Sequence, residues 1–234
     1  MLPDSKSSGC LYLVASPIGN LGDISSRAIE TLINCDFIAC EDTRVTGKLL
    51  SRLEIQKKLI SYREENEKTK SVQIALEIEQ GKKVALLSDA GYPCISDPGF
   101  RLVRECHTKQ LKVIPIPGPN AALTALAVSG LPTHQYTYLG FLPKKSAQTR
   151  KILDSWIAYE GSIVLYESKY KVQKTLALIA EIMGEDRFVC LARELTKSHE
   201  SIITGRITEV IDQQSKSSGK GEFTLVIAPQ NYSF

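Results

Sequence analysis

The chain has 234 residues, 43% of them hydrophobic, which is enough to bury one large core or two modest ones. No apolar run approaches the roughly 20 residues of a membrane helix and no apolar leader precedes Leu11, so we expect a cytoplasmic protein without a membrane partner. The six cysteines include no CxxC pair and several lie in apolar runs, which favours reduced core residues over a disulfide framework or zinc site, while the net charge of +3 only weakly suggests a nucleic-acid partner.

In the first half of the chain, short apolar runs typical of strands alternate with segments of helical period. An amphipathic stretch follows the first strand, a second helix is predicted from Thr46, a third ends at Gly81 and a fourth opens near Pro98. Gly81 stands where a left-handed helix cap is expected. The predicted strands are 11–16, 37–40, 57–62, 82–89 and 111–116.

The segment Pro115–Pro119 reads PIPGP and is expected to interrupt both helix and sheet, because proline lacks the amide proton. We therefore predict two domains, 1–116 and 117–234. In the second, helices are expected after residue 120, around Trp156 and up to Gly184. Strands are expected at 136–142, 162–168, 187–195 and 222–229. Repeated βαβ alternation predicts the α/β class, with two α/β domains and largely parallel sheets.

Ligands of open α/β sheets bind beyond the carboxyl ends of the strands, so the loops after the strands are candidate sites. The first loop, SPIGNLGD, has Gly19 and Gly22 but not the GxGxxG spacing, and taken alone a plain turn explains it better. The second, Glu41–Arg44, reads EDTR. It is either a solvated salt bridge leading into a helix capped by Thr43 or Thr46, or a set of catalytic groups at a strand end.

The third loop, DAGYPCISDPG, places Asp89 and Asp97 in eleven residues of tight turn. Ordering so long a turn merely to connect two elements is costly, which favours a binding loop. In the fourth, PGPNAALTA, small residues open a helix directly after a Pro-Gly turn and allow a ligand to lie against the backbone. Charged residues also follow two later strands, in YES and ARELTKSHE. His199 there has no companion at metal-ligand spacing and is interpreted as an ordinary polar residue.

These motifs together resemble one known family, the ribosomal RNA small-subunit methyltransferase I branch of the tetrapyrrole methylases. The resemblance runs in order from Leu11 to Pro229. It rests on LYLVASPIGNLGDIS, EDTR, SDAGYPCISDPG, IPGPNAALTAL, GFLPKK, LYES, ARELTK followed by HE, and KGEFTLVI. The chain departs from the usual family pattern at Tyr92, where Thr is usual, at Lys169–Lys171, where Pro-His-Arg is usual, and in YREENE from Tyr62, where a His-rich segment is usual.

The resemblance implies S-adenosylmethionine as cofactor, bound in a cleft between two α/β domains, and a homodimer. It implies 2′-O-methylation of a cytidine ribose in the decoding region of small-subunit ribosomal RNA, with the assembled subunit as the expected partner. By motif position, the cofactor contacts are expected at Pro17, Ile18, Asp89, Ala90, Tyr92, Asn120, Ala121, Tyr166 and Glu167.

Methyl transfer to a hydroxyl needs alignment of the reacting atoms and help in removing a proton, and it requires no metal. The catalytic candidates are Glu41, Arg44, Glu167 and Glu222, with Asp42 and Glu194 as further acids or bases. The expected substrate-binding cations are Lys144, Lys145, Arg193 and Lys220. Two alternatives stay open: a methyltransferase for a tetrapyrrole or protein residue, and a non-catalytic RNA-binding assembly factor of the same fold.

Overall fold

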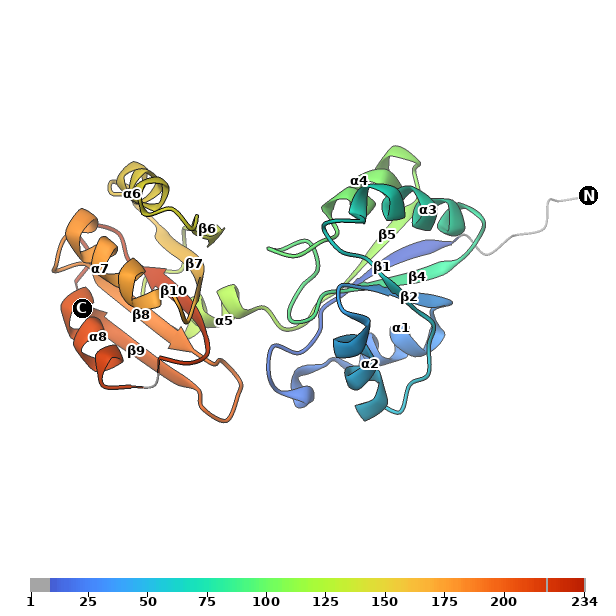
Figure 1. Ribbon diagram of the computed structural model, residues 1–234, viewed down its shortest axis with the longest axis horizontal. Helices are drawn as coiled ribbons and strands as arrows, with labels where there is room; N and C mark the ends of the chain where they lie inside the picture. Colours follow the sequence, from blue (N-terminus) through green and yellow to red (C-terminus); the bar gives the residue numbers. More distant parts are fainter. Residues whose placement is uncertain (1–8, 218, 234) are drawn as a thin grey trace, which may run out of the picture. The chain divides into compact units, whose positions relative to one another are not determined.

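The computed structural model describes residues 9–217 and 219–233, so the segment before Leu11 in which no leader is expected lies largely outside the described residues. The chain divides into two compact units, residues 1–120 and 121–234 (Figure 1). The domain boundary expected between residues 116 and 117 falls just before this division.

The first unit is built on a five-stranded parallel sheet of order β3-β2-β4-β1-β5. The expected strands are present: the first begins one residue earlier than expected and ends at Val14 instead of Ser16, the second is unchanged, and the others are shortened at one or both ends. Their bounds are β1 (Cys10–Val14), β2 (Phe37–Cys40), β3 (Leu59–Ser61), β4 (Lys83–Leu87) and β5 (Lys112–Ile116). The helices are α1 (Ser26–Asn34), α2 (Thr43–Arg52), α3 (Glu67–Glu79) and α4 (Phe100–Thr108), with a short 3₁₀ helix at Leu21–Asp23.

Helices cover both faces of this sheet because its strands alternate buried side chains between two cores. Ile38 and Cys40 of β2 point into the core formed with α1 and α2, whereas Phe37 and Ala39 point into the core formed with α3 and α4. Burial on both faces explains why these strands read as continuous apolar runs.

Two expectations for this unit are wrong. Helix α2 begins at Thr43, not Thr46, because the side chain of Asp42, rather than a threonine, caps it by accepting from the amide of Arg44 at 2.8 Å. Strand β5 runs through Pro115, which pairs with Leu13. It tolerates the proline because β5 is an edge strand and the missing amide faces away from its only neighbour.

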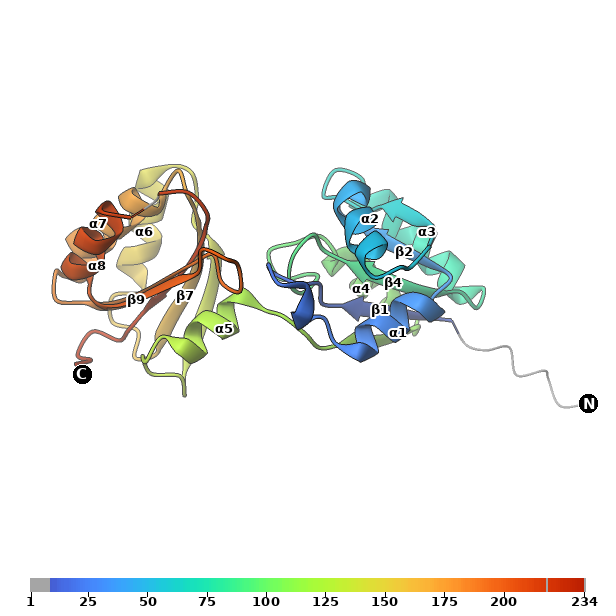
Figure 2. The same ribbon diagram turned by 90° about the horizontal axis from the view of Figure 1, so that it is seen from below.

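The second unit contains a five-stranded sheet of order β6-β7-β10-β8-β9. Its strands are β6 (Tyr136–Phe141), β7 (Ser162–Ser168), β8 (Phe188–Arg193), β9 (Ser201–Arg206) and β10 (Glu222–Ile227). Its helices are α5 (Ala121–Val128), α6 (Ser146–Ser155), α7 (Val172–Met183) and α8 (Ile207–Ser215). Helices α6 to α8 cover one face of the sheet and α5 lies on the other, against β7 and β10 (Figure 2).

The expectation of a largely parallel second sheet is wrong, because only β6 and β7 pair in parallel. Strand β8 returns directly into β9, which the sequence reading missed together with α8, and β10 inserts antiparallel between β7 and β8. As the βαβ pattern of the sequence predicts, β7 and β8 run in the same direction. The pattern does not reveal that they are not neighbours, because β10 lies between them.

The cysteine interpretation is confirmed for Cys10, Cys35, Cys40, Cys106 and Cys190, which are free and buried, while free Cys94 is half-buried. Within residues 9–217 and 219–233, no helix has the length and apolarity needed to cross a membrane.

Candidate active site

The carboxyl ends of the parallel strands bring three predicted loops of the first unit together. The backbones of Ser16 and Gly91 exchange hydrogen bonds of 2.8 and 3.1 Å, which joins the loop after β1 to the loop after β4. The hydroxyl of Ser16 also donates to the carbonyl of Ser88 at 3.0 Å. Gly118, after β5, lies so close to Ala15 that an added Cβ would be 2.9 Å from the alanine Cβ.

The expected cofactor residues of this unit are therefore neighbours. Ile18 is buried, and its Cγ2 lies 3.5 Å from the position that a Cβ on Gly91 would occupy. Pro17 is half-buried beside Ile18, as are Asp89 and Tyr92 in the third loop, whereas Ala90 is exposed. Asn120 is half-buried in the fourth loop, which packs on the first.

The EDTR loop lies at the same carboxyl edge of the sheet, meaning the side at which the parallel strands have their carboxyl ends. The amide of Asp42 donates to Oδ1 of Asp89 at 3.0 Å, which ties the loop after β2 to the loop after β4. The carboxylate of Asp42 is paired with Arg44, whose Nε lies 3.0 Å from Oδ1 and whose guanidinium is largely exposed. Arg63, just after β3, donates from Nε to the carbonyl of Glu41 at 3.2 Å and was not singled out from the sequence.

Three carboxyl groups here have raised pKa values. Burial raises the pKa of Glu41, and the charge of Asp89 adds to the effect. Burial also raises the pKa of Asp89. The pKa of Asp97 is raised to about 6 by burial first and by the charge of Glu41 second. In contrast, the hydrogen bonds from Arg44 lower the pKa of Asp42. This edge therefore holds carboxyl groups whose proton affinities differ, as acid–base sites require.

In the second unit, the structure brings the start of α5 to the end of β7. The hydroxyl of Tyr166 accepts from the amide of Ala122 at 3.2 Å, beside half-buried Ala121. The Tyr166 ring packs against Tyr138 and Phe141, with centroids 5.2 and 5.5 Å apart. Tyr166 is thus held at both ends, and Ala121 lies in its immediate neighbourhood.

Glu167 is 2% exposed and both of its carboxylate oxygens are engaged. Oε1 accepts from the amide of Ser168 at 2.8 Å, and Oε2 accepts from the hydroxyl of Thr175 at 2.7 Å. Lys171 lies 3.4 Å from Oε2 and donates to the carbonyls of Leu142 and Pro143. Glu167 and Lys171 therefore hold the loop that carries Lys144 and Lys145, both of which are exposed.

The remaining candidates meet around Lys197, which sequence reasoning did not single out. Lys197 bridges Glu194 at 2.9 Å and exposed Glu222 at 2.8 Å. Arg193 donates from Nε to the carbonyl of exposed Lys220 at 2.7 Å. The sequence feature that could have indicated this cluster is that the loops after β8 and before β10 both carry charged residues.

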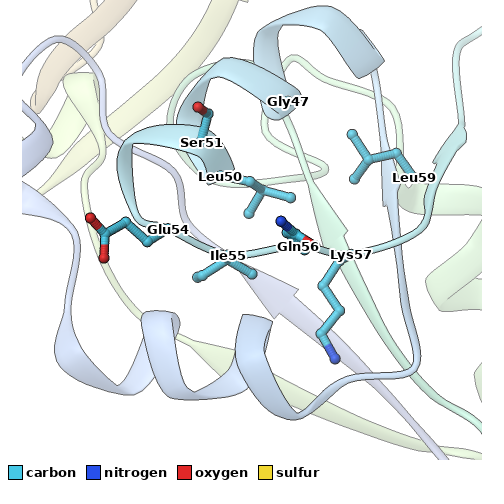
Figure 3. Close-up of a pocket in the computed structure, with 8 residues that line it drawn as sticks. All are labelled: Gly47, Leu50, Ser51, Glu54, Ile55, Gln56, Lys57 and Leu59. Carbon is cyan, nitrogen blue, oxygen red and sulfur yellow. The ribbon is translucent and has the colours of Figure 1, made fainter.

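A pocket of about 470 Å³ lies elsewhere, at the opposite edge of the first sheet (Figure 3). Helix α2 begins at the carboxyl end of β2 and runs antiparallel to the strands, so its last turn and the loop into β3 lie at the amino ends of the strands. We do not place the active site there, because the expected residues lie at the carboxyl edge. The pocket is lined by Gly47, Leu50, Ser51, Glu54, Ile55, Gln56, Lys57 and Leu59. In the described part of the chain, no three His, Cys, Asp or Glu side chains are grouped to hold a metal.

Solved structures share this fold. A cobalt precorrin-4 methyltransferase, CbiF, superposes with a TM-score of 0.71 at 14% identity, covering 97% of this chain and 98% of that one. A diphthine synthase gives a TM-score of 0.73 at 15% identity, covering 94% and 90%. Identities this low support the fold alone.

The sequence comparisons are more specific. A model of the tetrapyrrole (corrin/porphyrin) methylases matches residues 10–211. The ribosomal RNA small subunit methyltransferase I of Halalkalibacterium halodurans is 44% identical over 219 residues, covering 94% of this chain and 75% of the relative. The protein of the same name from Escherichia coli O157:H7 is 42% identical, covering 95% and 78%. The chain therefore belongs to the tetrapyrrole methylases and, within them, to the ribosomal RNA small subunit methyltransferase I family.

Proposed function

We propose that the protein is an S-adenosylmethionine-dependent methyltransferase that methylates the ribose 2′-oxygen of a cytidine in small-subunit ribosomal RNA. The relatives' names support an RNA substrate. The observation that carries the proposal is the joining of the loops after β1, β2 and β4 by the bonds of Gly91 to Ser16 and of Asp89 to Asp42. These are the loops in which the family resemblance implies cofactor contacts and in which the charges at the strand ends are the catalytic candidates.

The residues at this edge fit the cofactor. A half-buried carboxylate, Asp89, can accept from ribose hydroxyls or an adenine amino group. When bound, S-adenosylmethionine supplies an electrophilic methyl group on a sulfonium. That one cofactor molecule also contacts Ala121 and Tyr166 of the second unit stays a prediction.

For the proton of the attacking hydroxyl, we assign Glu41 as the base. It leaves the end of β2 half-buried, and its raised pKa makes it a stronger base than an exposed glutamate. Arg44 is exposed next to it and can face a phosphate or the developing alkoxide. Glu167 has both oxygens in hydrogen bonds, so we assign it the task of holding the loop with Lys144 and Lys145. Glu222 is assigned to the surface cluster around Lys197.

Mass mapping of ribose methylation tests the proposal. Small-subunit RNA from cells lacking the protein is expected to lose one 2′-O-methylcytidine, and purified protein with labelled S-adenosylmethionine is expected to restore it on assembled subunits. Glu41→Gln protein is expected to bind the cofactor without restoring the mark. Unchanged ribose methylation together with tight cofactor binding would favour a tetrapyrrole or protein substrate. Unchanged ribose methylation together with absent cofactor binding would favour an assembly factor.

We also propose a homodimer, which rests on the family resemblance. Sedimentation at micromolar concentration is expected to show a species of twice the mass of the chain, and a monomer at that concentration would reject the proposal.

A further inference from the structure

Helices α3 and α4 lie side by side in the first unit (Figure 1). Glu67, the first residue of α3, holds the start of α4 through its side chain. Glu67 is 7% exposed. Its Oε1 accepts from the amides of Gly99 and Arg101, each at 3.2 Å, and its Oε2 lies 3.6 Å from Nε of Arg101. Helix α4 has no side-chain cap of its own, since Gly99 is its N-cap residue. A carboxylate from another helix therefore satisfies amides that begin α4.

The glutamate is itself fixed from behind. The hydroxyl of Tyr62, a residue with no exposed surface, lies 3.3 Å from Oε1 of Glu67 and 2.9 Å from the hydroxyl of Ser71. Ser71 in turn donates to the carbonyl of Glu67 at 2.7 Å. The acceptor oxygen is thus held in one place by two buried side chains, Tyr62 directly after β3 and Ser71 in α3.

The segment that ends at Gly99 is the candidate cofactor loop, and its backbone is strained. Cys94 and Ser96 have φ angles of 73° and 62°, which residues other than glycine rarely adopt. Gly99 has φ of 145°, and a Cβ there would lie 2.5 Å from Sγ of Cys94. Such a conformation persists only where the surroundings impose it. The loop is tied at its start by Asp89 and Gly91 and at its end by Glu67.

We propose that Glu67 is a positioning residue for cofactor binding: without touching the cofactor, it holds the end of the loop that carries Asp89 and Tyr92 in its binding conformation. This inference rests on the proposed function, because it takes that loop as the cofactor site. The chain offers a matched control in Glu79, also on α3, which pairs with Lys109 after α4 at 3.2 Å and lies at the other ends of both helices.

Calorimetric titration with S-adenosylmethionine tests the proposal on four folded proteins: wild type, Glu67→Ala, Glu67→Gln and Glu79→Ala. Glu67→Ala is expected to raise Kd and KM for the cofactor about tenfold, with kcat at saturating cofactor changed less than about twofold. Glu67→Gln keeps an acceptor oxygen and is expected to restore most of the affinity. Glu79→Ala is expected to bind as wild type. Hydrogen exchange at residues 91–99 should be faster in Glu67→Ala alone.

Circular dichroism and binding stoichiometry separate lost affinity from lost fold. A Glu67→Ala protein that binds at full stoichiometry with wild-type Kd overturns the inference and leaves the proposed function standing. A reduced stoichiometry with unchanged Kd also overturns it, because Glu67 would then act only on folding. Wild-type protein that does not bind S-adenosylmethionine overturns the proposed function and this inference together.

Discussion

The backbone amide of Asp42 donates a hydrogen bond of 3.0 Å to the carboxylate of Asp89, which ties the carboxyl ends of β2 and β4. At the amino ends of the same two strands, the amide of Lys83 donates to Oδ2 of Asp36 at 2.7 Å. Each aspartate thus crosses between neighbouring strands to a backbone amide. Only Asp89 stands at the edge where the loops of the candidate site meet.

Replacing Asp89 with alanine is expected to weaken S-adenosylmethionine binding by roughly 1–3 kcal/mol, because a partly buried charged acceptor is lost. Titration calorimetry measures the change. Asp36→Ala is the matched control, since it removes the same kind of strand-to-strand bond at the opposite edge and should leave Kd unchanged. Equal affinities for wild type and Asp89→Ala would remove Asp89 from the site.

Stability is expected to depend on pH through Asp97. Its pKa is about 6 in the folded protein and 3.8 in the reference state, so the folded state holds a proton that the unfolded state releases. The contribution of Asp97 to the free energy of unfolding is fully present below about pH 4 and is lost as the pH rises through about 6. Replacing Asp97 with asparagine removes this pH-dependent loss of stability.

Urea unfolding at two pH values checks this. At pH 8, Asp97→Asn is expected to be more stable than wild type by on the order of 1 kcal/mol after allowance for solvent screening, and near pH 4 the difference should vanish. Asp23→Asn, at an exposed position in the short 3₁₀ helix, serves as control. A gain of the same size at both pH values would show that the charge of Asp97 is not responsible.

Glu167→Ala is expected to lower the free energy of unfolding by about 3 kcal/mol, because it leaves the Ser168 amide, the Thr175 hydroxyl and Lys171 without their shared acceptor. Glu222→Ala removes an exposed ion pair and is expected to cost less than about 1 kcal/mol. Denaturant titration compares the two. Similar small losses would mean that Glu167 is free for another task, catalysis among them.

The double variant Lys144→Ala/Lys145→Ala is expected to reduce RNA affinity and to lower the salt slope by roughly 1 to 1.5, since each phosphate contact contributes about 0.7 on a single strand. Filter binding of a small-subunit RNA fragment at several salt concentrations measures the slope. Cofactor affinity should not change.

The control for this experiment is Lys58→Ala/Lys82→Ala, two exposed lysines that precede β3 and β4 at the amino edge of the first sheet. If both double variants keep the wild-type slope, the Leu142–Lys145 loop is not part of an RNA path.

Most elements of the first unit were predictable because their signals are local. Strand β2 reads as four buried apolar residues, and Gly81, with φ of 100°, follows α3 as expected of a cap. The start of α2 was missed by three residues because Asp42 could be taken either as a loop charge or as a cap. Pro115 was expected to interrupt the sheet because the edge position of β5 is not visible in sequence.

The sequence by itself determined the family, the βα alternation, the loops that carry Glu41 and Asp89, and the strand end that carries Tyr166, since turn formers and charges at the ends of apolar runs are local features. Only the tertiary structure decided that the second sheet is mostly antiparallel, because β10 reaches its place between β7 and β8 after two further elements. It also decided that Glu167 is enclosed by hydrogen bonds and that Glu67 reaches Gly99. Such partners are 8 and 32 residues apart, and only packing brings them within bonding distance.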